Sequence, residues 1–309
     1  MRVVSDISLL PYNTFGIDAK AKLFIEYYSL DELRQVLKEH KGERMLHIGQ
    51  GSNLLFTQDF DGVILHSGMA RAKFLDNETV EAQNGLRLDD MIAQLTDMGY
   101  SGLEKLSLIP GEVGASAVQN VGAYGVEAKD VIERVYTIDV ESGEERVFTN
   151  AECKFGYRDS AFKHELKGKY IVTSVVYKVK PGDATKTREE IIETRNGKLP
   201  KVGEIGSAGS FFMNPFVQEE QAKELLKQYP DMPHFATPQG VKIPAAWLIE
   251  QCGWKGKTLG GAQVWPKQPL VIVNANHASA QDIMDLAAQV SASVKEKFNI
   301  DIHPEVNYI

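Results

Sequence analysis

Three short polar segments contain side chains suited to chemistry on an anionic substrate. The first reads Tyr157-Arg158-Asp159. A guanidinium at Arg158 could bind a substrate carboxylate through two parallel hydrogen bonds. The alternative is a structural ion pair between Arg158 and Asp159, and the segment by itself leaves both interpretations open.

The second segment is the run SAGS at 207–210, which two phenylalanines and Asn214 follow. A hydroxyl among small residues and aromatic rings could be a proton donor or a nucleophile, and the alternative is a serine that caps a helix. The third segment is Pro304-Glu305, in an apolar stretch near the end of the chain. Burial would raise the pKa of Glu305 and make it an acid, whereas exposure would make it a surface residue on an edge strand. Composition alone does not join the three segments into one site.

Glycine is dense in residues 102–125, which read GLEKLSLIPGEVGASAVQNVGAYG. This density argues against an ordinary helix or strand, because each glycine costs backbone entropy. A backbone without Cβ atoms can approach a flat or anionic ligand closely. We therefore expect a binding loop in which the amides of Gly111, Gly114 and Ala115 face phosphates and residues 122–125 surround a ring system.

A second glycine loop, GQGSN at 49–53, follows an apolar strand. Two such loops on separate elements indicate an extended ligand held at two points, and a glycine-rich structural bend is the alternative. Leu54 stands where a dinucleotide-binding fingerprint requires its third glycine, which argues against a Rossmann fold. The triplet GKT at 256–258 imitates the end of a phosphate loop, but Gln251 stands where the first glycine should be, so we attribute it to chance.

The composition is that of a globular protein, with 43% hydrophobic and 25% charged residues. A net charge of −8 argues against a nucleic-acid partner. Cys153 and Cys252 form no C-x-x-C motif, and no two of the seven histidines have metal-ligand spacing, so we expect no disulfide framework and no metal. His47 is expected to be a core histidine. No apolar run reaches the roughly 18 residues of a membrane span, and no signal peptide is recognisable, so a cytoplasmic protein without a membrane partner is expected.

The segments are expected to be positioned by alternating helices and strands. Residues 1–67 form a small β-α-β unit whose helix begins with a capping box of Ser29 and Glu32. Its expected elements are strands at 22–28, 45–48, 54–56 and 62–66 and a helix at 30–40.

The same sequence patterns predict the helices and strands of the next two regions. Residues 68–199 contain strands at 79–82 and 170–179, a hairpin at 131–148, and helices at 88–95, ended by Gly99, and 187–195, ended by Gly197. Residues from 200 onward contain helices at 219–229 and 244–252, a third that begins after Ser279, and a strand at 270–274. The tail, residues 298–309, alternates like a strand.

Seven motifs occur in one order along nearly the whole chain. They are NTFG at 13–16, GQGSNLL at 49–55, LIPGEVGASAVQNVGAYG at 108–125, FGYRDSAFK at 155–163, GSAGSFFMNP at 206–215, AAWLIEQCGWKG at 245–256 with GGA at 260–262, and PEV at 304–306. Together they resemble the UDP-N-acetylenolpyruvoylglucosamine reductase family, FAD enzymes that complete UDP-N-acetylmuramic acid for bacterial peptidoglycan.

The resemblance implies an α+β FAD-binding fold of the vanillyl-alcohol-oxidase or p-cresol-methylhydroxylase type. It implies FAD-binding subdomains at 1–67 and 68–199 and an α+β substrate-binding domain at 200–297. The C-terminal strand, at about 298–309, would return to the first subdomain. Non-covalent FAD, NADPH as the reductant and a monomeric state are also implied.

The implied reaction reduces UDP-N-acetylglucosamine enolpyruvate. NADPH reduces the flavin, and a hydride then passes from flavin N5 to C3 of the enolpyruvyl group while C2 is protonated. By resemblance Ser210 is the proton donor, and Arg158 and Glu305 stabilise the carboxylate-centred intermediate. The implied FAD contacts are Gly49, Gly51, Ser52, Asn53, Ile109, Pro110, Gly111, Gly114, Ala115, Gly122, Ala123 and Gly125. The implied substrate contacts are Tyr124, Tyr157, Lys198, Asn214 and Gln268.

Two features depart from the family pattern. The long form of the family carries, between the residues that match Arg158 and Ser210, an inserted loop whose tyrosine covers the uridine, and this chain has no tyrosine after Tyr177 in that interval. Asn307 stands two residues after Glu305, where an arginine is frequent. Two other functions stay open, a flavin oxidase of another small alcohol or sugar and a non-catalytic sugar-nucleotide-binding protein that has lost its flavin.

Overall fold

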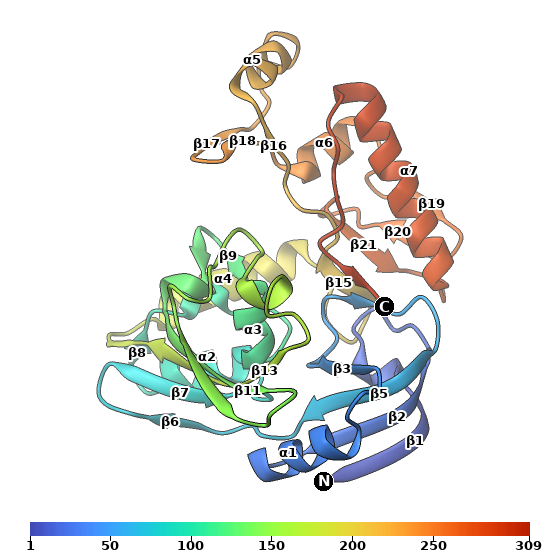
Figure 1. Cartoon of the computed structure of the whole chain (residues 1–309). Coiled ribbons are helices and arrows are strands. Elements are labelled where there is room, and N and C mark those ends of the chain that lie inside the picture. The colour runs from blue at the N-terminus through green and yellow to red at the C-terminus, as the bar shows by residue number, and fades with distance from the viewer. The chain divides into compact units, whose positions relative to one another are not determined.

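The computed structural model describes all 309 residues, which divide into two compact units. The first unit comprises residues 1–12, 20–51 and 59–195, and the second comprises residues 13–19, 52–58 and 196–309. Each unit has its own hydrophobic core. Figure 1 labels most of the elements described below.

The first unit begins with a four-stranded sheet in the order β1-β2-β5-β3. Its strands are β1 (Arg2–Ser8), β2 (Lys20–Tyr27), β3 (Met45–Ile48) and β5 (Phe60–Ser67). Helix α1 (Leu30–Glu39) buries its apolar stripe against β2 and β5. Half of the expected capping box is present: Ser29 accepts a hydrogen bond from the amide of Glu32, but the Glu32 carboxylate accepts from the amide of Tyr28 instead of Ser29.

A five-stranded antiparallel sheet follows in the same unit, in the order β12-β11-β13-β7-β6. The expected hairpin is confirmed as β11 and β12. The strands are β6 (Ala72–Phe74), β7 (Thr79–Gln83), β11 (Ile132–Asp139), β12 (Glu145–Thr149) and β13 (Tyr170–Lys178). Helices α2 (Leu88–Asp97) and α3 (Val113–Gln119) contribute to the core that covers this sheet. Short pairs, β8 (Tyr100–Ser101) with β14 (Lys180–Pro181) and β9 (Gly122–Ala123) with β10 (Val126–Glu127), complete the unit.

The second unit is built on a sheet in the order β15-β21-β20-β19. Its strands are β15 (Gly206–Ser210), β19 (Thr258–Leu259), β20 (Ala262–Val264) and β21 (Val271–Asn274), and the long helix α7 (Ala280–Phe298) packs against the last three. Helix α6 (Ala245–Gln251) packs on α7. A small sheet of β16 (Phe216–Val217), β18 (Gly240–Lys242) and β17 (Phe235–Thr237) lies with helix α5 (Glu219–Gln228), and β4 (Leu54–Leu55) pairs in parallel with β22 (Asn307–Tyr308).

Three expectations about these elements are wrong. The glycine stretch is not a loop throughout, because residues 113–119 form α3, in which only Gly114 is a glycine. Helix α4 (Thr185–Lys198) continues through Gly197, where an added Cβ would meet nothing within 4 Å, and it ends just before Pro200. The tail is not one strand, because its first residue, Phe298, belongs to α7 and Asn299 ends that helix in a left-handed conformation. Within the tail, only Asn307–Tyr308 forms a strand. None of the helices is long and apolar enough to cross a membrane.

Candidate functional site

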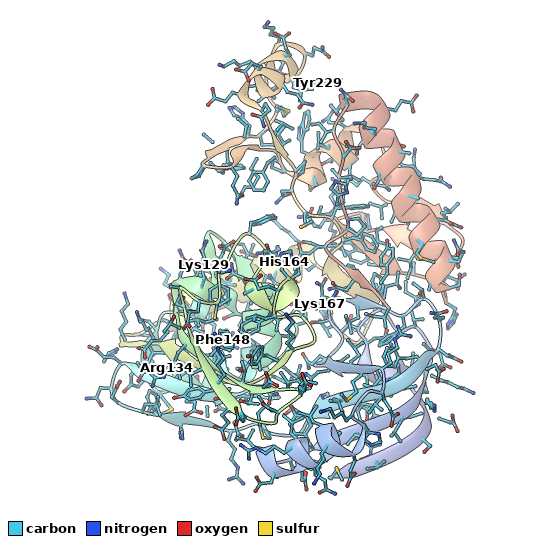
Figure 2. All side chains as sticks on the ribbon, viewed as in Figure 1. Lys129, Arg134, Phe148, His164, Lys167 and Tyr229 are labelled. Carbon is cyan, nitrogen blue, oxygen red and sulfur yellow. The ribbon has the colours of Figure 1, made fainter.

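Arg158 lies in a tight turn of the first unit, between Gly156 and Asp159, which pair with each other. Its backbone is left-handed, at φ 53°, and its guanidinium donates a 2.5 Å hydrogen bond from Nη2 to the carbonyl of Gly122. Asp159 lies 2.7 Å from His164, which Figure 2 labels. The bond to Gly122 ties the arginine to the glycine stretch.

Ser210 is the last residue of β15 in the second unit and is exposed. The alternative reading as a helix cap is wrong, because no helix begins there. Gly209 has φ 69° and the pairing with β21 is irregular just before Ser210. The next residues, Phe211 and Phe212, are buried. This irregularity lets the serine hydroxyl face solvent while both phenylalanine rings stay in the core.

Glu305 lies beside the serine segment although 95 positions separate it from Ser210 in the sequence. Its amide donates a 2.7 Å hydrogen bond to the carbonyl of Phe211, and its own carbonyl accepts one of 3.2 Å from the Asn53 side chain. Pro304 forms a bridge with Phe212. The side chain is half-buried and precedes β22, so Glu305 is on neither an edge strand nor a fully buried one. The fold of the second unit thus brings together the backbones of two of the three predicted catalytic residues.

The two glycine loops meet within the first unit. Gln50 accepts at its side-chain Oε1 a 2.8 Å hydrogen bond from the amide of Gly111, and the amide of Gly114 donates to the carbonyl of Asn84 at 3.0 Å. The expectation that the amides of Gly111 and Gly114 face phosphates is therefore wrong, since protein acceptors occupy both. Ala115 lies exposed on α3.

The end of the glycine stretch is a hairpin. Gly122 and Ala123 form β9, and Tyr124 and Gly125 turn the chain with φ angles of 52° and 79°. Two consecutive positive φ angles suit the right-handed twist of the paired strands β9 and β10. Tyr124 is exposed at this tip, and open space surrounds the position of a Cβ on Gly125. The remaining predicted FAD contacts lie in the turns before these elements: Gly49, Gly51, Ile109 and Pro110 in the first unit, and Ser52 and Asn53 in the second.

A buried guanidinium in the first unit fits an anionic cofactor. Arg195, on α4, donates from Nη2 to the carbonyl of Leu108 at 3.2 Å, and its Nε is the one buried side-chain nitrogen or oxygen without a hydrogen-bond partner. Burial lowers the pKa of Arg195, while Tyr124 and Asp89 oppose that shift. A buried cation with an unpaired donor costs free energy unless an anion meets it. The pyrophosphate of FAD is such an anion, so the residues around the glycine stretch fit this cofactor.

The predicted substrate residues divide between the units. In the first, the ring of Tyr157 lies 5.2 Å from the Arg158 guanidinium, and Tyr124 is at the hairpin tip. In the second, the Asn214 side chain accepts a hydrogen bond from the amide of Ala245 at 2.9 Å, at the start of α6. Lys198 is exposed at the end of α4, and Gln268 lies half-buried in the turn after β20.

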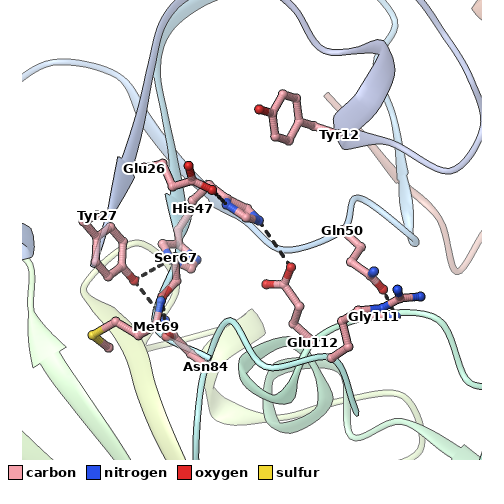
Figure 3. Close-up of polar contacts among 12 residues, drawn as sticks. Tyr12, Glu26, Tyr27, His47, Gln50, Ser67, Met69, Asn84, Gly111 and Glu112 are labelled. Carbon is pink, nitrogen blue, oxygen red and sulfur yellow. Dashed lines mark hydrogen bonds and ion pairs between the residues drawn. The ribbon is translucent and has the colours of Figure 1, made fainter. Parts of the chain in front are cut away.

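Sequence reasoning missed a buried polar cluster beside the glycine loops (Figure 3). His66 lies between Glu26 and Glu112, at 3.1 Å and 3.2 Å. The available signal was Glu112, the single acid between Lys105 and Glu127 in a stretch that is otherwise without charge. His47, as expected, is a satisfied core histidine, because its Nε2 is 2.8 Å from the Tyr27 hydroxyl and burial lowers its pKa to about 3.

The chain matches known proteins over nearly its whole length. Residues 21–149 match the family model of an FAD binding domain, and residues 200–309 match that of the UDP-N-acetylenolpyruvoylglucosamine reductase C-terminal domain. A UDP-N-acetylenolpyruvoylglucosamine reductase from Bacteroides fragilis is 46% identical over 98% of both chains, and one from Flavobacterium johnsoniae is 40% identical over 100% of both. The crystal structure of UDP-N-acetylenolpyruvylglucosamine reductase from Thermus caldophilus superposes with a TM-score of 0.77 at 26% identity, covering 100% of this chain and 99% of that one.

These matches confirm the expected α+β FAD-binding fold. The coverage is nearly complete in each direction, and the two matched domains together account for most of the chain. The chain therefore belongs to the UDP-N-acetylenolpyruvoylglucosamine reductase family, whose members are FAD-binding oxidoreductases of peptidoglycan synthesis.

Proposed function

We propose that this protein reduces UDP-N-acetylglucosamine enolpyruvate to UDP-N-acetylmuramate with NADPH as the reductant. The observation that carries the proposal is the position of Ser210. It is the exposed last residue of β15, two buried phenylalanines follow it, and the first of these is hydrogen-bonded to the backbone of Glu305. The names of the relatives support the substrate. Bound FAD, which the two glycine loops would hold, would supply the hydride from N5 for C3 of the enolpyruvyl group.

Ser210 supplies the proton. A hydride added at C3 leaves negative charge at C2 and the adjoining carboxylate, and a proton at C2 completes the reduction of the double bond. An unaided serine is a weak acid, so transfer from its Oγ requires the developing carbanion as the acceptor. Arg158 and Glu305 stabilise and polarise the carboxylate at which the charge develops.

The other side chains hold the substrate. The contacts proposed for its diphosphate and sugar, and for the nicotinamide nucleotide, are Tyr124, Tyr157, Lys198, Asn214 and Gln268. Lys198 is exposed and carries the positive charge that a diphosphate requires. The interval after Tyr177 contains no tyrosine to cover the uridine, so in this chain other residues take that role. The reaction is expected to occur in the cytoplasm and on a monomer.

A stopped-flow absorbance experiment tests the proposal. The purified protein is reduced with NADPH without oxygen, and UDP-N-acetylglucosamine enolpyruvate is then added. The flavin band is expected to bleach with NADPH and to return only with the enolpyruvyl substrate. A band that stays bleached would contradict the substrate, and rapid oxygen consumption with a sugar and no NADPH would indicate a flavin oxidase instead.

A further inference from the structure

The cluster of Glu26, His66 and Glu112 joins three segments of the first unit (Figure 3). His66 is on β5, Glu26 is on β2, and Glu112 directly precedes α3. The imidazole Nδ1 lies 3.1 Å from Glu26 Oε1, and Nε2 lies 3.2 Å from Glu112 Oε1. Ionised carboxylates only accept hydrogen bonds, so an imidazole that satisfies both must donate from both nitrogens and carry a proton on each.

Glu112 is directed away from the helix that it precedes. It occupies the N-cap position of α3, but its side chain makes no capping hydrogen bond. Its carboxylate instead reaches His66 and leaves no room at the first glycine loop, because a Cβ on Gly49 would lie 2.9 Å from Glu112 Oε2. An acid at an N-cap position ordinarily accepts a hydrogen bond from a backbone amide in the first turn of its helix. The structure thus directs the charge of Glu112 to His66, which pairs with Ile48, the residue before the first glycine loop.

A second contact joins the same loops in the opposite direction. Gln50, next to Gly49, accepts the amide hydrogen of Gly111, next to Glu112. Gln50 therefore binds the backbone of the turn at 110–112, and the Glu112 carboxylate lies beside Gly49. The far end of the cluster is also fixed, since Glu26 accepts a 2.6 Å hydrogen bond from the Tyr28 hydroxyl and lies 3.7 Å from Arg2.

We propose that Glu112 and His66 are positioning residues that hold the loop at 49–51 and the turn at 110–112 at the spacing FAD requires. Burial of three ionisable groups is costly and by itself does not favour folding. Their side chains are only 6% to 17% exposed, and they join the two loops whose motifs carry the flavin-binding resemblance. The inference rests on FAD binding and not on which substrate the flavin reduces.

The charges around His66 set the direction of a pH effect. Burial lowers the pKa of His66, but the hydrogen bonds and charges of Glu112 and Glu26 outweigh it, so that the pKa is raised. Burial raises the pKa of Glu112 against the opposing effect of His66 and Arg87. Glu26 has a lowered pKa, because the hydrogen bonds of Tyr28 and His66 and the charge of Arg2 outweigh its burial. His47 also faces the imidazole and is neutral near pH 7, since its pKa is about 3. As pH rises above the pKa of His66, one of its two donated hydrogen bonds is lost.

The test measures the dissociation constant of FAD between pH 6 and pH 9.5. The purified holoprotein is diluted at each pH, and the release of FAD is followed by flavin fluorescence anisotropy. For the unaltered protein we expect the affinity to fall as pH rises, by roughly tenfold, the equivalent of about one charge-assisted hydrogen bond. His66→Gln is expected to bind FAD about tenfold more weakly at pH 6 and to show no such pH dependence. Glu112→Gln keeps the shape of the side chain and removes its charge, so it should mainly weaken the pH dependence of FAD affinity.

His40→Gln is the matched control, because His40 forms a comparable pair with Glu43 at 2.9 Å on the surface, after α1. It should bind FAD as the unaltered protein does at every pH. Hydrogen exchange provides a readout without cofactor: the amide of Gly111 should exchange faster in His66→Gln, while amides of β13 do not change. The proposal would be overturned if His66→Gln and Glu112→Gln bound FAD with unchanged affinity and unchanged pH dependence. Equal acceleration of amide exchange throughout the first unit would overturn it as well. A protein that binds no FAD at any pH would contradict the family assignment instead.

Discussion

Residues 102–125 in the first unit and residues 203–215 in the second are both rich in glycine, yet different contacts hold them in place. Buried side chains add to the main-chain bonds of the first stretch: Ser116 Oγ lies 2.6 Å from the Tyr177 hydroxyl, and Asn120 donates to the carbonyl of Gly156 at 2.7 Å. Around Ser210 the second is held mainly by main-chain bonds, from the amide of Ser207 to Thr14 at 2.9 Å and from that of Phe211 to Leu270 at 2.7 Å.

This difference separates two tasks. A stretch positioned by buried side chains changes shape when one of them is replaced, and such a stretch suits a cofactor that stays bound. A segment positioned by its main chain keeps its place when a side chain changes, so the side chain of Ser210 is free for chemistry. The contrast predicts that substitutions in the second segment alter rate and that those around the first alter stability and flavin binding.

The largest effect is expected on rate, for Ser210→Ala. Loss of the proton donor should slow the oxidation of reduced flavin by the enolpyruvyl substrate by about 10² to 10⁴-fold. Flavin reduction by NADPH and the melting temperature should not change, because the hydroxyl is exposed and the pairing with Val271 uses the backbone. Single-turnover stopped-flow measurements separate the two half-reactions, and Ser207→Ala on the same strand is the control. Equal slowing of both half-reactions would contradict the role given to Ser210.

The largest effect on stability is expected for Asn84→Ala. Asn84 is buried, donates to the Tyr27 hydroxyl at 2.9 Å and to the carbonyl of Val172 at 2.7 Å, and accepts from Ser67 at 2.6 Å. Its loss leaves buried partners unsatisfied, which should cost roughly 3 kcal/mol in the free energy of unfolding. Hydrogen exchange should accelerate in β7 and β13, with β21 of the second unit as the internal reference. Equal acceleration in β21 would show that the effect is not confined to the first unit.

A smaller loss is expected for Gly114→Ala. Its Cβ would lie 2.9 Å from that of Asn84, so α3 or β7 must shift, at about 1 to 3 kcal/mol. Gly197→Ala is the control, because the same change in α4 meets nothing within 4 Å and should stabilise by up to about 1 kcal/mol. Urea unfolding of the two variants gives both values. A Gly114→Ala protein as stable as the unaltered one would show that the first stretch is less tightly packed than its contacts indicate.

The smallest effect is the pH dependence of stability in the first unit. The raised pKa of His66 contributes stability that is complete below the unfolded value of about 6.5 and is lost as pH rises through the folded value. The lowered pKa of Glu26 contributes stability that is present above its unfolded value of about 4.3 and is lost as pH falls through the folded one. Protection of β5 amides, relative to their intrinsic exchange rate at each pH, should therefore be greatest between these limits. A profile that does not change in His66→Gln would mean that other groups cause it.

The sequence by itself determined the family, the α+β class and most elements. Ordered motifs, apolar periodicity, and turn residues are local properties, so the helix at α1, the hairpin of β11 and β12, and the N-cap of α7 could be predicted from them. Local pattern failed where a contact from elsewhere decided the outcome. Gly114 is accommodated in α3 because Asn84 occupies the space that a Cβ at this position would need. No property of residues 102–125 reveals that neighbour.

Only the tertiary structure decided which polar side chains meet. His66 and Glu112 are 46 positions apart, and Ser210 and Glu305 are still farther apart, so no spacing in the chain indicates either proximity. The pairing of β2 with β5 sets Glu26 opposite His66, and Glu112 reaches the same imidazole from the residue before α3. The bond between the amide of Glu305 and the carbonyl of Phe211 places the second two. Charge and burial then set the pKa of each group, because both depend on neighbours that the fold supplies.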